Sequence, residues 1–223
     1  MATDAPIPMP IDTDILTLSQ WFSPNYPIGA FSYSHGLEWA AASGAVTDAA
    51  SLKMWIEGVL QYGAGQSDAL FLAASYWAAS AKEISEIDAL ARAFTASAER
   101  LLETTAQGAA FCKATADIWR ADLPELTYPV AVGRAARLED LPLDLTAQMY
   151  LHSFVSNIVM AATRLAPVGQ TEAQALIHEL APLCAEIAEQ TETGDLEALS
   201  GTAFLADIQA MQHETQRSRI FRT

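Results

Sequence analysis

The chain has 223 residues, of which 27 are Asp or Glu and 12 are Lys or Arg, giving a formal net charge of −15. This length is sufficient for one sizeable hydrophobic core, and 51% hydrophobic against 17% charged residues excludes disorder for the bulk of the chain. The acidity argues against nucleic acid or an anionic membrane as the main partner, because both are bound by clustered Lys and Arg.

Targeting and membrane signals are weak. The first ten residues are acidic and rich in proline, unlike a signal peptide, and they predict a flexible segment over 1–11. Residues 145–163 carry no charge, but they include polar side chains that would need partners in hydrocarbon, so a helix buried in a soluble protein is expected (Gln148, His152, Ser153, Ser156 and Asn157). Two cysteines, Cys112 and Cys184, lie on apolar stripes and suit a reducing cytoplasm, with no disulfide framework.

Apolar residues recur with the helical period along almost the whole chain. Asp48 is a candidate cap for the helix that buries Leu52 and Ile56, and Pro182 is expected to kink or split a later helix. The helices near 97–120 and 204–211 each carry an apolar stripe, which begins at Leu101 in the first and at Phe204 in the second. Both stripes are expected to face the core. The expected helices span, in order, 12–22, 36–43, 48–60, 66–80, 83–96, 97–120, 129–138, 143–166, 173–187 and 204–211.

No segment alternates apolar and polar residues over the length of a strand, so no sheet is expected. The sequence predicts an all-α fold, a single compact bundle of roughly ten helices over residues 12–212, with residues 213–223 as a separate tail. The helix at 143–166 lacks a charged face and is expected to be covered on both sides.

Several catalytic and cofactor motifs are missing. The sequence holds no P-loop, no dinucleotide-binding G-x-G-x-x-G after a strand, no H-E-x-x-H and no G-x-S-x-G. Its four histidines are scattered, and this spacing favours neither a metal site nor a catalytic centre (His35, His152, His178 and His213). A protein that is not an enzyme and has no cofactor of its own is expected.

Residues 23–39 (SPNYPIGAFSYSHGLEW) form a stiff segment, because two prolines fix its backbone. Tyr26, Phe31 and Tyr33 lie close together within it, and aromatic side chains are enriched at protein interfaces. The same rings could instead fill the domain's own core.

Residues 213–223 (HETQRSRIFRT) hold three of the chain's nine arginines beside Ile220 and Phe221. On an acidic protein, this basic and aromatic tail is suited to an acidic surface, and Arg beside an aromatic anchor is typical of interface hot spots. That surface could belong to a partner or to the chain itself, for instance the acidic stretch between Glu186 and Glu197. A frayed, solvated tail is the alternative.

These two segments resemble the UreF family of urease accessory proteins, through LTLSQ at 16–20, PIGAFSYSHGLE at 27–38 and the terminal HETQRSRIFRT. Three internal landmarks of the family follow in the right order: ERLLETTAQG at 99–108, YPVAVG at 128–133 and VGQ at 168–170. The resemblance therefore covers essentially the whole chain. His35 departs from the glutamine usual in the family and adds a possible ligand.

The resemblance implies a cytoplasmic, non-catalytic maturation factor that works as a homodimer. It would bridge a UreD-type (UreH-type) accessory protein and a UreG-type GTPase on apo-urease, so that nickel is inserted with GTP bound by the partner and nickel handled by the complex. The matching positions expected to bind partners are Phe31, Tyr33, His35, Arg217, Arg219, Ile220, Phe221 and Arg222.

Two alternatives stay open at this point. The chain could stimulate a partner GTPase by supplying Arg219 in trans, as an arginine finger does. Alternatively, His152, Ser153 and Ser156 could line a hydrolase cavity, although no carboxylate on their helix would orient the imidazole.

Overall fold

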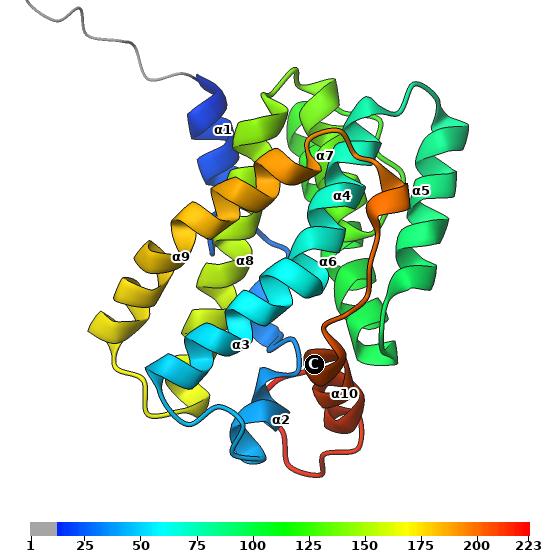
Figure 1. Cartoon of the computed structure of the whole chain (residues 1–223). Coiled ribbons are helices and arrows are strands. Elements are labelled where there is room, and N and C mark those ends of the chain that lie inside the picture. Colours follow the sequence, from blue (N-terminus) through cyan, green and yellow to red (C-terminus); the bar gives the residue numbers. More distant parts are fainter. Residues whose placement is uncertain (1–12) are drawn as a thin grey trace, which may run out of the picture.

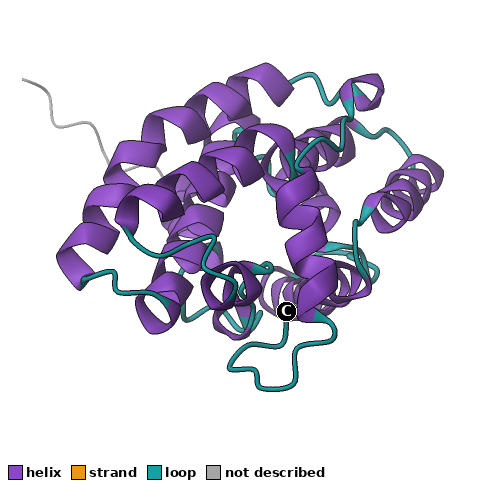
Figure 2. Cartoon of the chain, turned by 60° about the horizontal axis from the view of Figure 1, so that its bottom comes forward, coloured by secondary structure: helices purple, strands orange, loops and turns teal. Residues whose placement is uncertain are grey.

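The computed structural model describes residues 13–223, and within them the expected all-α fold is confirmed (Figure 1). The described residues contain no strand, and loops join the helices directly (Figure 2). The expected flexible segment 1–11 lies outside the described residues. The helices are α1 (Thr13–Trp21), α2 (Leu37–Ala42), α3 (Ala49–Tyr62), α4 (Ala64–Trp77), α5 (Ala81–Phe94), α6 (Ala98–Trp119), α7 (Tyr128–Leu138), α8 (Leu143–Leu165), α9 (Gln170–Thr191) and α10 (Phe204–His213), with short 3₁₀ turns η1 (Ala30–Ser32) and η2 (Leu196–Ala198).

Local sequence signals account for several helix ends. Asp48 caps α3 as expected: its carboxylate accepts the backbone N–H of Ser51 at 2.8 Å, and the Ser51 hydroxyl accepts the Asp48 N–H at 3.1 Å. Ser97 caps α6 through the N–H of Arg100. These bonds satisfy backbone donors that a helix start leaves free, and they explain why both expected starts are close to the observed ones.

The core lies where α4 crosses α7 and where α8 lies along α9. Helix α4 buries residues on every side, and α7 is pressed against it at Gly133. A Cβ atom added to Gly133 would lie 2.0 Å from the Leu72 carbonyl oxygen and 2.2 Å from the Ser75 hydroxyl. Glycine is therefore required there by the close approach of two helix backbones.

We expect Gly133→Ala to destabilise the fold by about 1–3 kcal/mol or more, because neither helix backbone can move aside without disturbing the core. Gly58 lies inside α3, and a Cβ added there would have no atom within 4 Å, so Gly58→Ala is the matched control and should stabilise by about 0.5–1 kcal/mol. Urea denaturation of both variants measures the two effects. Equal stability of the two variants would contradict the packing described for α4 and α7.

Three expectations about helix faces and breaks are wrong in part. Helix α9 continues through Pro182, which lies inside it, so the helix is not split there. On α6, Leu101 is exposed although Cys112 of the same stripe is buried, and the helix also buries polar side chains such as Glu103 and Gln107. On α10 the apolar face points outwards, with exposed fractions of 66% for Phe204, 70% for Leu205, 49% for Ile208 and 48% for Met211.

Helix α8 is only partly covered. It packs against α9 and also meets α2, α3, α4 and α7, but His152 and Met160 remain exposed and Ser156 is half-buried. The absence of charged residues over 145–163 therefore does not reflect complete burial, because an uncharged strip of the helix faces outwards.

Both cysteines are buried and free, and burial raises the pKa of Cys112 to about 11 and that of Cys184 to about 12.

No helix in the part of the chain from residue 13 onwards combines the length and hydropathy that crossing a bilayer requires.

Candidate functional site

The end of the C-terminal tail lies against the body of the protein, beside the aromatic segment 23–39. The backbone N–H of Ser34 donates to the Thr223 carbonyl oxygen at 2.7 Å, and the Ser34 hydroxyl donates to the same atom. The N–H of Arg222 donates to the Ser32 carbonyl oxygen at 2.8 Å. The two segments singled out in the sequence therefore meet, although they are separated by nearly the whole chain.

Glu38 holds the tail in place. Its carboxylate is buried and accepts the backbone N–H groups of Ile220 at 2.7 Å and Phe221 at 2.8 Å. The same carboxylate lies 3.3 Å from Nε2 of His213, whose side chain is completely buried at the end of α10. A buried carboxylate is stable only when paired and hydrogen-bonded, and these three contacts provide that compensation.

A second carboxylate, Glu99 at the start of α6, completes what we call the tail clamp, consisting of Glu38, Glu99 and His213. Nδ1 of His213 lies 2.6 Å from Glu99, and the Arg219 guanidinium forms an ion pair with the same carboxylate. The clamp joins α2, α6 and α10 to the tail. Beyond it, the Thr223 hydroxyl donates to Glu103 at 2.8 Å.

Arg164 binds both segments from the end of α8. Its guanidinium lies over the Phe221 ring, 4.4 Å from the ring centroid, and donates to the Phe31 carbonyl oxygen at 3.2 Å. These two interactions hold the Arg164 side chain in place, and Arg164 is the first charged residue after the uncharged stretch of α8. Phe221 is buried by these contacts, so the tail is not frayed.

The predicted partner-binding residues divide into two groups. Exposed side chains are those of Phe31 at 68% and Ile220 at 66%, together with Arg217, Arg219 and Arg222. Buried ones are Tyr33, His35 and Phe221. The buried side chains pack beneath the exposed ones, and the exposed group forms what we call the tail–loop surface. Partner binding by either group stays a prediction.

Sequence reasoning misses the residues that hold the tail: Glu38, Glu99, His213 and Arg164. The tail is expected to suit an acidic surface, and the chain supplies one itself, but through Glu38, Glu99 and Glu103 and not through the stretch between Glu186 and Glu197. The signal is present in the sequence, because Glu38 ends the motif at 27–38 and Glu99 begins the one at 99–108.

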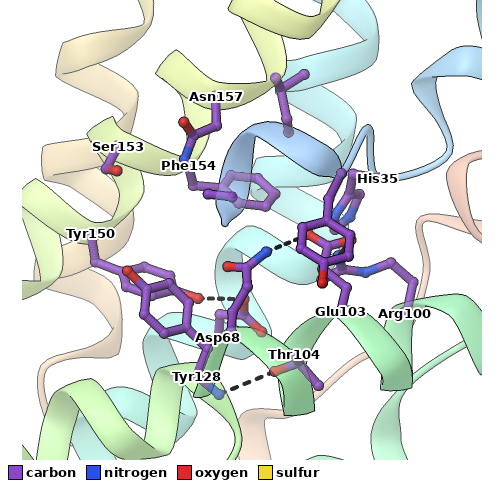
Figure 3. A pocket seen from close by; sticks show the side chains of 14 residues that line it. His35, Asp68, Arg100, Glu103, Thr104, Tyr128, Tyr150, Ser153, Phe154 and Asn157 are labelled. Atoms are coloured by element: carbon purple, nitrogen blue, oxygen red, sulfur yellow. Dashed lines mark hydrogen bonds and ion pairs between the residues drawn. The ribbon is translucent and has the colours of Figure 1, made fainter. Parts of the chain in front are cut away.

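A polar cavity of about 40 Å³ lies behind the aromatic segment (Figure 3). Asp68 points into it and accepts the Tyr150 hydroxyl at 2.8 Å, and Arg100 forms an ion pair with Glu103. A second cavity of about 250 Å³ shares lining residues with the first, among them Asp68 and Arg100. Because about 10–15 Å³ holds one water, even the smaller cavity has room for a few water molecules.

Burial shifts the acid–base properties of this interior. Desolvation raises the pKa of Asp68 to about 6, although Arg100 and the Tyr150 hydrogen bond act in the opposite direction. Desolvation, assisted by Arg100, also lowers the pKa of His35 well below its usual range. A perturbed carboxyl group in a polar cavity is a common feature of functional sites and also of structural networks.

His35 is held as a neutral core residue. It has a positive φ of 59°, packs edge-to-face on Phe154 with ring centroids 5.1 Å apart, and leaves Nδ1 without a hydrogen-bond partner. Across residues 13–223, no group of three or more His, Cys, Asp or Glu side chains is arranged to hold a metal ion. The possible ligand noted in the sequence therefore has no companions in this region.

The residues of the hydrolase alternative do not form a catalytic arrangement. His152 is exposed, and the Ser153 hydroxyl donates to the Phe22 carbonyl oxygen at 3.4 Å. Among the described residues, no hydrogen bond joins His152 to Ser153, to Ser156 or to a carboxylate.

Comparison with known proteins identifies the family. A family model for UreF matches residues 46–181. The urease accessory protein UreF of Ruegeria pomeroyi is 56% identical, with 96% of this chain and 99% of the relative aligned. Proteins of the same name from Roseobacter denitrificans and Rhodopseudomonas palustris are 50% and 41% identical over the whole chain, covering 96% and 99% of their own lengths. The chain belongs to the UreF family of urease accessory proteins.

Proposed function

We propose that this protein acts in urease maturation as a docking component. It would connect a UreD-type accessory protein with a UreG-type GTPase on apo-urease and so promote GTP-dependent nickel insertion. Family membership supports the urease accessory role. One observation carries the docking role: the tail and the aromatic segment together form a surface on which Phe31 and Ile220 are two-thirds exposed, beside arginine side chains.

The apolar face of α10 extends this proposal. Phe204, Leu205, Ile208 and Met211 occupy one side of the helix that leads directly into the tail, and all four are exposed. Contiguous exposed apolar side chains on a soluble protein usually mark an interaction site. We assign the tail–loop surface and this face of α10 to the UreD-type partner.

Membership of this family implies a homodimer, with nickel and GTP handled by partner proteins. A homodimer would place uncharged surface at its centre, and the outward strip of α8 with His152 and Ser156 offers such a surface. Nickel and GTP would be held by the partners, within the cytoplasm. The arginine-finger alternative would require the Arg219 guanidinium to leave Glu99.

Removing the tail tests the docking role. We expect truncation after Gln216 and the single change Arg219→Ala to leave a folded, helical protein that no longer co-purifies with a UreD-type partner, because both changes remove contacts that hold the tail–loop surface. Arg137→Ala is the matched control, since Arg137 is an exposed arginine on α7 that pairs with Asp140 and belongs neither to the tail clamp nor to the tail–loop surface. Unchanged co-purification of the truncated protein would exclude the tail from the docking site.

A further inference from the structure

A second surface lies on a different part of the molecule. A groove of about 410 Å³ runs between α5 and the segment that follows α9, over the end of α4. Figure 1 shows this segment, in orange, crossing α4 towards α5 before the chain continues to α10. We call it the Trp77 groove, lined by Ala74, Trp77, Ala78, Glu83, Glu86, Ile87, Leu90, Thr193, Gly194 and Leu196.

The groove is preformed. The segment after α9 packs closely against α4 at Gly194, where an added Cβ would lie only 2.4 Å from the Ala74 nitrogen. The φ of Gly194 is 64°, a conformation that favours glycine, so this wall of the groove has a fixed position. The Trp77 indole N–H donates to the Glu192 carbonyl oxygen at 2.9 Å, which fixes the ring. The ring nevertheless remains 57% exposed. Rigid, half-exposed aromatic rings are effective anchors, since little side-chain entropy is lost when a partner binds.

The groove has an apolar floor between two acidic walls. Trp77, Ile87 and Leu90 contribute apolar surface, and Leu90 is 40% exposed. One wall carries Glu83 and Glu86 on α5. The other wall carries exposed acidic side chains next to its lining residues, namely Glu192, Asp195 and Glu197. Lys82 adds one positive charge, which is ion-paired with Glu86 at 3.4 Å.

The chain does not cover this surface with its own basic segment. The arginines of the tail lie at the tail clamp, where Arg219 pairs with Glu99, so the acidic stretch between Glu186 and Glu197 receives none of them. A second copy of the chain is a poor occupant, because its net charge is −15 and its basic segment is likewise engaged. Charge complementarity therefore favours a basic occupant with apolar side chains.

We propose that the Trp77 groove binds a basic, amphipathic segment of a partner protein, with apolar side chains against Trp77 and Leu90 and Lys or Arg side chains between the acidic walls. This proposal is independent of the docking role of the tail, because the two surfaces share no residue. It identifies the occupant by chemistry: alternating apolar and cationic positions, as on one face of a helix laid into a groove.

A fluorescent peptide of leucine and lysine, with leucines spaced to form one helix face, serves as the probe, and a scrambled peptide of the same composition serves as its control. We expect saturable binding of the amphipathic peptide that weakens as salt is raised. Glu86→Gln, Glu192→Gln and Glu197→Gln together, and Leu90→Ser separately, should each weaken it by about tenfold, a difference of about 1.4 kcal/mol.

The matched control carries the same change in net charge away from the groove, as Asp117→Asn, Asp122→Asn and Glu125→Gln. It should bind the peptide as the unaltered protein does. Circular dichroism and thermal unfolding verify that every variant is folded. The proposal is overturned if the control weakens binding as much as the groove variants, if the scrambled peptide binds equally well, or if no saturable binding occurs. Self-association that the groove variants abolish would also overturn it, because a second copy would then be the occupant.

Discussion

Replacing Glu38 with alanine is expected to release the tail. The change removes the acceptor of the buried backbone N–H groups of Ile220 and Phe221, and it also removes the carboxylate that lies 3.3 Å from Nε2 of His213. Breaking a buried, charged network of this kind costs about 3–5 kcal/mol. Since about 1.4 kcal/mol is a factor of ten, the open tail should become more populated by roughly a hundredfold or more.

Limited digestion with trypsin measures this release, because the tail presents Arg217, Arg219 and Arg222 as cleavage sites once it leaves the body. Cleavage should be much faster in Glu38→Ala than in the unaltered protein. Binding of the UreD-type partner should weaken in parallel, because affinity falls with the fraction of molecules in the competent state.

Two further variants make the result specific. Glu38→Gln keeps one carbonyl acceptor and should restore part of the protection. Glu179→Ala removes a surface carboxylate that pairs with Lys53, at 2.9 Å, and should change neither digestion nor partner binding. Slow cleavage of Glu38→Ala, with the tail still protected, would show that the clamp does not depend on this carboxylate.

Asp68→Asn is expected to stabilise the protein at neutral pH. The pKa of Asp68 is raised from 3.8 to about 6 in the folded state, mainly by burial. Between these values the folded protein binds more protons than the unfolded chain, so its stability falls as pH rises from about 4 to about 6. At pH 7 the ionised carboxylate lowers the free energy of unfolding by up to about 3 kcal/mol.

Asparagine removes this titration and keeps an oxygen that accepts the Tyr150 hydroxyl. The variant should therefore unfold at higher urea concentrations than the unaltered protein at pH 7, and the difference should shrink towards zero near pH 4. Urea denaturation across this range measures the difference directly. Asp117→Asn, at an exposed position, is the control and should show no such change. A difference that does not vary with pH would contradict the assignment of the shift to Asp68.

The fold can be predicted largely because helix ends and periods depend on neighbouring residues. The expected helix 97–120 is close to α6, and the expected helix 143–166 is close to α8. Pro182 does not end its helix: it lies inside α9, and the contacts of α9 with α8 stabilise the helix despite the missing hydrogen bond.

The direction of an apolar stripe cannot be predicted in the same way. The period identifies that Phe204, Ile208 and Met211 share one side of a helix, but a side that faces a partner has the same pattern as one that faces the core. The buried polar side chains of α6 are the opposite case. The chemistry of Glu103 and Gln107 favours solvent, and the cavity that accommodates them depends on distant residues such as Asp68 and Tyr150.

Only half of the candidate site follows from the sequence. The aromatic and basic residues of segments 23–39 and 213–223 identify these two segments in the sequence. The contact between them depends on Glu38 and Glu99. Glu38 and Glu99 lie within the motifs at 27–38 and 99–108, but acidic residues are common in this chain, and charge alone does not distinguish a carboxylate that accepts buried backbone N–H groups from one that faces water.

The bond between Ser34 and Thr223 spans 189 positions of the sequence, so it has a consequence for biosynthesis. A ribosome delivers Ser34 early and residues 219–223 long afterwards. During that interval the loop around Phe31 has no tail beside it, and Arg164 has no Phe221 ring beneath it. The contact between the two segments can therefore form only after residues 219–223 have been synthesised.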